Sequence, residues 1–273
     1  MVRHGRRRFG FLAAALLAAG ISSPAFAAQC GNNAGGFNTW IGQFKAEAAS
    51  QGVSQRTLDN AFRNVRYATK TISLDRNQHS FKLSLEQFMA KRGANAIISR
   101  GKGLKKSNAA LFNAIEKRYG VPAGPLIAIW GMESGFGSFM GNQHTMSAVS
   151  TLAYDCRRSA YFTDQLYALL TLIERGWISP DFKGAAHGEI GQTQFLPRNV
   201  INYGASGDGN RSVDLRSKAD ALASTANFLR AHGWQPGAGY QPGQANFRAI
   251  QGWNAAGVYQ KAIAIIGAEI DGS

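Results

Sequence analysis

The stretch Ile127-Ala-Ile-Trp-Gly-Met-Glu-Ser-Gly-Phe-Gly137 places a single carboxylate within an apolar helical pattern. The positions i, i+3, i+4 and i+7 of one helical face are Leu126, Ile129, Trp130 and Glu133. Glycine tolerates the left-handed conformation at a helix C-terminus, so the two glycines that follow Ser134 are expected to end this helix. The pattern predicts a packed helix that starts near Pro125 and carries Glu133 at its C-terminal end.

A carboxylate in such a position is rarely buried unless it is paired or functional. Desolvation raises the pKa of a carboxyl group, and a carboxyl that stays protonated near neutral pH can act as a general acid. The residues alone leave two interpretations open. Glu133 is either a general acid beside a cleft or a buried structural glutamate held by hydrogen bonds.

The first 27 residues have the organisation of a secretory signal peptide. Four arginines precede an apolar run at residues 9–21, which is too short to span a bilayer comfortably, and Ala25-Phe26-Ala27 is a small-x-small cleavage site. We therefore expect export to the periplasm, a flexible segment at residues 28–36 and no transmembrane span in the mature chain. Gln29 precedes Cys30 where a lipoprotein has a small residue, so lipidation is not expected.

The chain is strongly basic. It has 30 Lys and Arg against 16 Asp and Glu, a net charge of +14, and loss of the four signal arginines leaves +10. A basic exported protein suits an anionic partner. The basic residues are scattered and show no zinc-finger, basic-zipper or RNA-recognition pattern, which argues against nucleic acid. A cell-wall polymer that carries carboxylates fits the compartment better.

The chain has two cysteines, Cys30 and Cys156. In an oxidising compartment they can pair and tie the mature N-terminus to the core. The alternative is two unrelated thiols, or one reactive thiol. Two cysteines with no nearby histidines do not make a metal site.

Helical patterns dominate the mature chain, and alternating strand patterns are scarce. We expect helices over residues 40–50, 54–62, 74–92, 107–119, 125–134, 145–153, 159–176, 220–232 and 254–269. Residues 93–103 are expected to be looser, and a small sheet is expected near residues 179–183 or 212–215. The sequence thus predicts one mainly α-helical domain over residues 37–271, and we expect a monomer.

Residues 184–199 read Gly-Ala-Ala-His-Gly-Glu-Ile-Gly-Gln-Thr-Gln-Phe-Leu-Pro-Arg-Asn. Closely spaced glycines allow the backbone to approach a ligand. Gln192, Gln194 and Phe195 offer amide hydrogen bonds beside a flat apolar face, a combination that suits the hydroxyls, N-acetyl groups and ring faces of a sugar. The alternative is an ordinary glycine-rich turn before a short helix.

Several separated motifs occur in a specific order. They are Glu-Ser-x-Phe-Gly, then Gly-Gln-Thr-Gln-Phe-x-Pro, then a Gly-Asp-Gly loop, then Ala-Asn-Phe-Leu-x-x-His-Gly-Trp. In this order the chain resembles the membrane-bound lytic transglycosylase B family from about residue 36 to residue 270. The resemblance implies a lysozyme-like fold of the goose-type and soluble lytic transglycosylase kind. It also implies peptidoglycan glycan strands as the partner.

The resemblance implies roles for individual residues. Glu133 matches the single catalytic acid/base of the family. The positions that match residues of the glycan-binding cleft are Gln194, Phe195, Asn254 and Tyr259. Trp253 stands where the family commonly has another aromatic residue, and we expect it to bind substrate as well. Arg157 and Arg158 match an arginine pair that would meet the carboxylates of peptide stems.

The sequence also departs from the family pattern around the glycine-rich segment. Ala185 stands where the family often has a serine beside the catalytic glutamate, so a hydrogen bond to Glu133 is either missing or supplied by water. His187 and Glu189 replace residues that are usually small.

The loop at residues 204–210 resembles an EF-hand-like calcium loop of the family. A calcium loop needs several oxygen ligands at alternating positions. Ser206 and Asp208 are candidate ligands, but Gly204 stands where the first acidic ligand is needed. We therefore expect no cofactor and keep calcium as the alternative.

The number of carboxylates bears on the reaction. Glycosidases usually need two, and the Glu133 segment has no acidic neighbour before Asp155. The resemblance implies a lytic reaction in which Glu133 is first the acid and then the base, and which leaves 1,6-anhydro-N-acetylmuramic acid ends. A lysozyme-type hydrolase would need a second carboxylate such as Asp155, Asp181 or Glu189. A non-catalytic peptidoglycan-binding protein is the third reading, and Ala185 is the residue that favours it.

Overall fold

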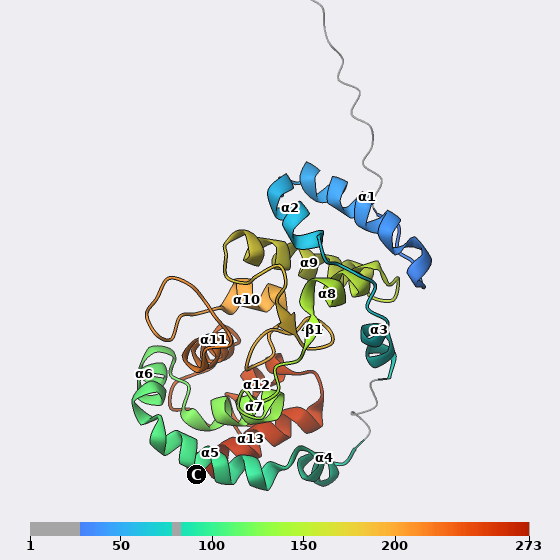
Figure 1. Cartoon of the computed structure of the whole chain (residues 1–273). Coiled ribbons are helices and arrows are strands. Elements are labelled where there is room, and N and C mark those ends of the chain that lie inside the picture. The colour runs from blue at the N-terminus through green and yellow to red at the C-terminus, as the bar shows by residue number, and fades with distance from the viewer. Residues whose placement is uncertain (1–27, 78–82, 273) are drawn as a thin grey trace, which may run out of the picture.

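The computed structural model describes residues 28–77 and 83–272, and helices are its main elements (Figure 1). The element order is η1 (Ala34–Gly36), α1 (Phe37–Ser50), α2 (Gln55–Phe62), α3 (Thr69–Arg76), α4 (Leu85–Arg92), α5 (Ala94–Ser107), α6 (Ala109–Tyr119), α7 (Ala123–Ser134), β1 (Gln143–His144), α8 (Thr145–Tyr154), α9 (Ser159–Glu174), β2 (Lys183–Gly184), α10 (Pro197–Tyr203), α11 (Lys218–Ala231), α12 (Phe247–Trp253) and α13 (Gly257–Asp271). The predicted mainly α-helical fold with a very small β element is confirmed. The predicted signal peptide lies outside the described residues.

Helix α7 is the centre of the core. It packs against α5, α6, α11 and α13, and Figure 1 shows it in the lower half of the view, directly above α5 and α13. Every residue of α7 except Glu133 is buried, as expected for a helix that is apolar all round. Leu126, Ile127 and Ile129 have no exposed area, and burial of each such side chain contributes about 1.5–3 kcal/mol. The apolar α7 therefore holds the backbone of Glu133 in a rigid part of the fold.

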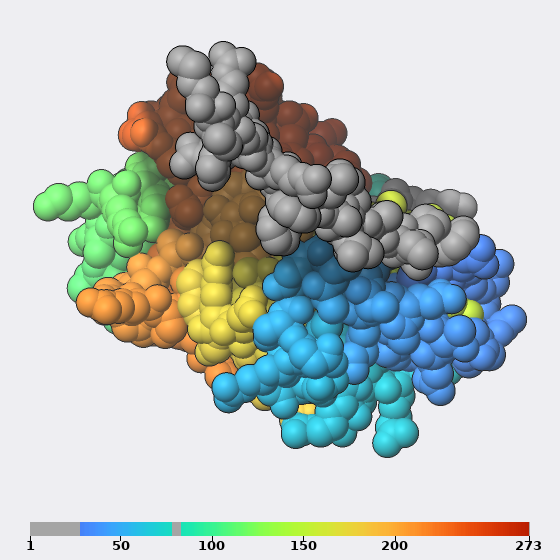
Figure 2. Space-filling view, turned by 90° about the horizontal axis from the view of Figure 1, so that it is seen from above, coloured from blue at the N-terminus to red at the C-terminus, as the bar shows by residue number. Residues whose placement is uncertain are grey.

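The N-terminal helices α1 and α2 lie on the side of the molecule formed by α8 and α9. Helix α1 packs against α8 and α2 packs against α9, and the blue residues of this segment form a broad area in Figure 2. A disulfide joins Cys30 to Cys156, with 5.0 Å between the two Cα atoms. The backbone N–H of Gly31 also donates to the carbonyl oxygen of Tyr154 at 2.9 Å. The segment before α1 is thus tied to the end of α8.

The only sheet in the described residues has two short strands. β1 pairs antiparallel with β2, with Gln143 opposite Gly184 and His144 opposite Lys183. Of the two expected positions, residues 179–183 overlap the sheet at Lys183 alone, and the prediction at residues 212–215 is wrong. Two-residue strands are too short to leave an alternating pattern in the sequence.

The single helix expected over residues 74–92 is also wrong. Helix α3 ends at Arg76, and α4 starts at Leu85. The side chain of Ser84 accepts from the backbone N–H of Gln87, and the Gln87 side chain accepts from the backbone N–H of Ser84. This capping box starts a new helix, and its local hydrogen bonds were not recognised in the sequence pattern.

Residues 94–103 are helical and not loose, because they belong to α5. Gly93 has a left-handed conformation with φ of 66°, so it ends α4 and immediately precedes α5. Gly101 is a packing residue, since a Cβ atom there would lie 2.7 Å from Ile270 and 2.9 Å from Ile127. Gly101 therefore allows α5 to approach α7 and α13 closely.

The remaining differences concern short elements and helix ends. The seven-residue helices α10 and α12 were not expected, because so few residues show no clear period. The helix expected from residue 254 starts at Gly257, and the helix expected from residue 107 starts at Ala109, after Asn108. None of the described helices is long and apolar enough to cross a membrane.

Candidate active site

Glu133 is the one partly exposed residue of α7, and it lies one residue before the end of that helix. Gly135 ends α7 in the left-handed conformation, with φ of 57°. The hydroxyl of Ser134 accepts from the backbone N–H of Gly137 at 2.9 Å and donates to the carbonyl oxygen of Gln192. The chain after Glu133 is therefore fixed to the glycine-rich segment at residues 184–199.

Two donors from the C-terminal part of the chain meet the Glu133 carboxyl group. The Tyr259 hydroxyl donates to Oε1 of Glu133 at 2.7 Å, and the indole Nε1 of Trp253 donates to the same oxygen at 3.1 Å. Tyr259 is on α13 and is buried, whereas Trp253 is the last residue of α12 and is partly exposed. Burial and the nearby Glu133 carboxylate raise the pKa of Tyr259 well above its ordinary value, so its hydroxyl stays protonated. Oε1 is thus occupied, and no group in the described residues donates a hydrogen bond to Oε2.

The surroundings of Glu133 favour its neutral form. Burial raises the pKa of this carboxyl above its ordinary value, and the hydrogen bonds from Tyr259 and Trp253 and the charge of Arg92 only partly oppose that effect. The negative charge of Glu189 raises the pKa of Glu133 further. A carboxyl group with a raised pKa beside an opening can hold a proton near neutral pH and deliver it.

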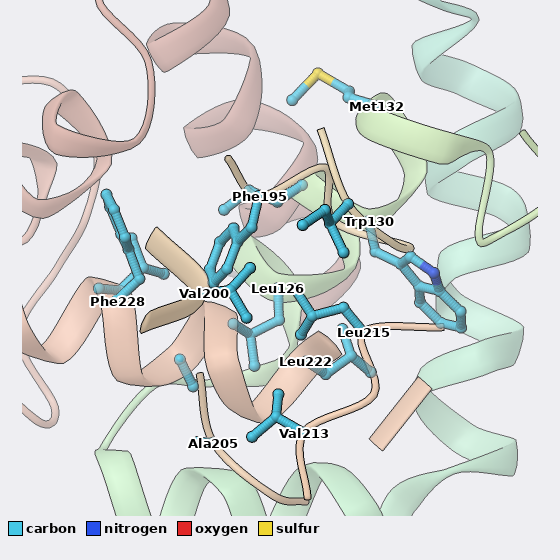
Figure 3. Packing of buried hydrophobic residues seen from close by; sticks show 14 of the residues in the cluster. Leu126, Trp130, Met132, Phe195, Val200, Ala205, Val213, Leu215, Leu222 and Phe228 are labelled. Carbon is cyan, nitrogen blue, oxygen red and sulfur yellow. The ribbon is translucent and has the colours of Figure 1, made fainter. Parts of the chain in front are cut away.

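Phe195 does not lie where it was expected. Its ring is only 2% exposed, so it presents no face to a glycan, and this part of the prediction needs correction. The ring packs against Trp253 with 5.3 Å between ring centroids, and Phe228 packs edge-on against Trp253 at 5.1 Å. Figure 3 shows Phe195 and Phe228 among the buried side chains of the core. An aromatic ring in a glycine-rich segment fits a sugar face or a core equally well, and only packing distinguishes the two.

The amide side chains of the glycine-rich segment are mostly engaged with the scaffold. Gln192 accepts from the indole Nε1 of Trp130 at 2.8 Å and is buried. Gln194 is partly exposed, donates to the carbonyl oxygen of Gly191 at 2.7 Å, and has an unusual positive φ of 55°. Gln194 is therefore the member of this segment whose amide remains accessible.

Asn254 shapes the segment that leads into α13. Its Oδ1 accepts from the backbone N–H of Ala256 at 2.9 Å, and its carbonyl oxygen accepts from Nε2 of Gln260 at 2.8 Å. These hydrogen bonds set the start of the helix that carries Tyr259. Asn254 itself is partly exposed.

Arg157 and Arg158 meet a buried partner that the sequence reasoning missed. Both guanidinium groups pair with the carboxylate of Asp75, which is 2% exposed. Asp75 lies in α3, and its pairing with the two arginines depends on how α3 packs against α8. The arginine side chains remain partly exposed, so each has a side toward solvent as well as toward Asp75.

A histidine and a glutamate extend this charged cluster toward Glu133. Nε2 of His187 lies 3.8 Å from Asp75, and its Nδ1 lies 3.1 Å from Oε1 of Glu189. The backbone N–H of His187 donates to Oε2 of Glu189 at 2.8 Å. Burial raises the pKa of Glu189, but the hydrogen bonds and the charge of His187 outweigh it, and the pKa lies below the ordinary value. His187 and Glu189, the two residues that differ from the family pattern, thus pair with each other.

Removing both arginines is expected to destabilise the fold. In the double variant Arg157→Ala with Arg158→Ala, the buried Asp75 loses its two main partners, and the free energy of unfolding should fall by about 1–3 kcal/mol. Denaturant unfolding measures this, with the exposed pair Lys106→Ala and Lys117→Ala as the charge-matched control. Addition of Asp75→Asn should restore much of the loss. A double variant as stable as the control would show that the pairing contributes nothing.

The loop proposed for calcium is closed by its own hydrogen bonds. The Ser206 hydroxyl donates to Asp208 at 3.0 Å, and both oxygens of the buried Asp220 accept backbone N–H groups, from Gly207 and Asp214, at 2.8 Å each. In residues 28–77 and 83–272, no three His, Cys, Asp or Glu side chains are grouped to hold a metal ion. The two candidate ligands, Ser206 and Asp208, thus bond to each other, and Gly204 offers no side-chain oxygen beside them.

The chain is similar to known transglycosylases in both sequence and structure. The model of the transglycosylase SLT domain matches residues 36–243. The chain is 33% identical over 121 residues to membrane-bound lytic murein transglycosylase B of Escherichia coli K12, a segment that covers 44% of this chain and 34% of that protein. The structure is similar to SltB3 of Pseudomonas aeruginosa in complex with NAG-anhNAM-pentapeptide, with TM-score 0.81, 27% identity and coverage of 87% of this chain and 80% of that chain. Slt35 of Escherichia coli, solved in complex with calcium, has the same fold, with TM-score 0.74, 21% identity and coverage of 89% and 96%.

Proposed function

This chain belongs to the transglycosylase SLT domain family, and from that premise we propose that it is an exported lytic transglycosylase of peptidoglycan. The observation that carries the proposal is the Glu133 carboxyl group, which stands at the end of a buried helix with a raised pKa and with both protein donors on one oxygen. The bond to be cleaved is the β-1,4 bond between N-acetylmuramic acid and N-acetylglucosamine. The product ends are 1,6-anhydro-N-acetylmuramic acid.

The proposed reaction uses Glu133 twice. The protonated carboxyl first gives its proton to the glycosidic oxygen, and the bond from that oxygen to C1 of the muramic acid breaks. The substrate's own N-acetyl group stabilises the positive charge that develops at C1. The Glu133 carboxylate then takes the proton of the 6-hydroxyl, whose oxygen forms the new bond to C1. The proton returns to Glu133, and no water is consumed.

The substrate proposal rests on charge and on one relative. The P. aeruginosa SltB3 structures hold NAG-anhNAM-pentapeptide and NAG-NAM-pentapeptide. Arg157 and Arg158 have partly exposed guanidinium groups, which can pair with carboxylates of a peptide stem without releasing Asp75. Gln194, Trp253 and Asn254 are the partly exposed members of the proposed glycan-binding set.

The organisation of the chain is part of the same proposal. Residues 1–27 would be removed as a signal peptide, residues 28–36 would lead into the domain, and residues 37–271 would form the catalytic domain of a periplasmic monomer. The disulfide between Cys30 and Cys156 supports export, because disulfides persist in oxidising compartments.

One observation favours a second candidate, a hydrolase with two carboxylates. Of the three carboxylates considered for that role, Asp155 is buried and pairs with Arg76 at 2.8 Å, and Asp181 is exposed and binds Asn64. Glu189 alone is close enough for its charge to affect Glu133, and its lowered pKa keeps it ionised. An ionised carboxylate near the acid could activate a water molecule.

Mass spectrometry of digested peptidoglycan tests the two candidates. Anhydro ends are expected from the wild-type protein, and they should persist in Glu189→Gln, with a rate within about tenfold of wild type, because no base other than Glu133 is needed. Loss of the like charge should lower the pKa of Glu133, so activity should decline at a lower pH than in wild type. Exposed Glu116→Gln on α6 is the matched control. Reducing ends that disappear in Glu189→Gln would establish the hydrolase instead.

A further inference from the structure

The two donors on Oε1 of Glu133 are chemically different. A tyrosine hydroxyl can donate or accept a hydrogen bond, whereas an indole N–H can only donate. If Oε1 carried the proton, Tyr259 could rotate its hydroxyl and accept it, but Trp253 could not. Only the contact with Trp253, at 3.1 Å, requires Oε1 to be an acceptor.

Trp253 is held so that its N–H points at Glu133. The indole contacts Phe195 with ring planes at 43° and contacts Phe228 edge-on at 80°. Both phenylalanines are buried, with 2% and 4% exposure, and Phe228 stacks in turn on His232 with centroids 3.9 Å apart. These contacts come from the glycine-rich segment and from α11, so two separate elements fix the orientation of the indole.

We propose that Trp253 is a positioning residue that keeps the proton of Glu133 on Oε2. The proposal rests on the proposed function of Glu133 as acid and base. Phe195 and Phe228 orient the indole, and the indole N–H occupies Oε1. The acidic proton is therefore left on Oε2, to which no group in the described residues donates. Phe195 thereby contributes to the site through Trp253 and without contact to a glycan.

Loss of the indole N–H should change the pH dependence of cleavage. Trp253→Phe keeps an aromatic ring but removes a donor that stabilises the ionised carboxylate, so the pKa of Glu133 should rise by about one unit. The high-pH limb of the kcat profile should move up by the same amount. At neutral pH kcat should fall about tenfold, because the carboxyl group loses its fixed orientation as well as the preference that keeps the proton on Oε2, while KM changes little.

The other charged and titratable groups around Glu133 remain in place in this variant. They are Tyr259 on α13, Arg92 on α4 and Glu189 in the glycine-rich segment. Since none of them is altered, a shift of the high-pH limb is attributable to the missing N–H.

A matched control is available in Trp234, a buried tryptophan whose indole Nε1 donates to the carbonyl oxygen of Gly120 at 2.9 Å. Trp234→Phe also loses an indole hydrogen bond, but its pH profile should coincide with that of the wild type. Phe195→Leu is the second variant, because it keeps the N–H and loosens its orientation. It should lower kcat about threefold or more, with a smaller shift of the high-pH limb.

The Glu133→Gln and Trp253→Phe variants together distinguish failure of the role of Trp253 from failure of the role of Glu133. If Glu133→Gln is inactive and Trp253→Phe has the wild-type pH profile and kcat, Trp253 does not position the proton. Should Trp253→Phe fail to fold, a wild-type kcat and profile in folded Phe195→Leu would overturn the proposal in the same way. If Glu133→Gln keeps its activity, the assignment of Glu133 fails, and with it the proposed function.

Discussion

Glu133→Gln is expected to reduce the release of soluble muropeptides from purified peptidoglycan by roughly 10²–10⁴-fold or more. The amide has the shape of the carboxyl group and can still accept from Tyr259 and Trp253 through its carbonyl oxygen. It cannot donate a proton as an acid, and it cannot accept the proton of the 6-hydroxyl as a base. Both steps of the proposed reaction therefore fail in one variant.

The fold of Glu133→Gln should be intact. Burial already disfavours the charged form of Glu133, so a neutral amide should cost no stability, and thermal unfolding should occur at or above the wild-type temperature. Exposed Glu116→Gln serves as the control and should retain activity. A Glu133→Gln protein that still releases muropeptides near the wild-type rate would show that another group delivers the proton.

The double variant Cys30→Ser with Cys156→Ser is expected to lose roughly 2–5 kcal/mol of unfolding free energy. The disulfide joins positions separated by 126 residues, so it restricts a long segment of the unfolded chain. Without the disulfide, the segment is still held to the end of α8 by two backbone hydrogen bonds, from Gly31 to Tyr154 at 2.9 Å and from Cys156 to Gly31 at 3.4 Å. Denaturant unfolding at equilibrium measures the loss.

The wild-type protein treated with a reductant is the matched control and should unfold at the same denaturant concentration as the double variant. Protein prepared from the periplasm should have no free thiols when it is unfolded without reductant. Two thiols titrating under those conditions would contradict the expectation, and so would equal stability of the variant and the oxidised wild type.

Local patterns account for the parts of the fold that were predicted well. The stripe that ends at Glu133 predicts α7, because a helix repeats every 3.6 residues and its apolar positions can be read within two turns. The same reasoning predicts most of α1, α8, α9 and α11. It fails at α5, where Gly101 is a contact with Ile127 and Ile270 that no local period reveals.

In the candidate site too, the sequence identified individual residues, whereas their contacts became clear only from the structure. The sequence selected Glu133, and through family resemblance it selected Trp253 and Tyr259, but it did not assign either of them as a donor to the carboxyl. Arg157 and Arg158 were chosen for a ligand, yet their contact inside the molecule is Asp75, which lies over 80 residues earlier in the chain. His187 and Glu189 were noted as departures, and only their positions reveal that they pair.

The sequence by itself determined that this chain is mainly helical, that it belongs with the lytic transglycosylases, and that one carboxylate ends a buried helix. Tertiary structure alone decided which oxygen of Glu133 is occupied and that Phe195 packs behind Trp253. The physical reason is the distance along the chain over which each kind of interaction acts. Helix period and capping act over a few residues, whereas the donors to Glu133 come from 120 and 126 residues away and meet it only when the core packs.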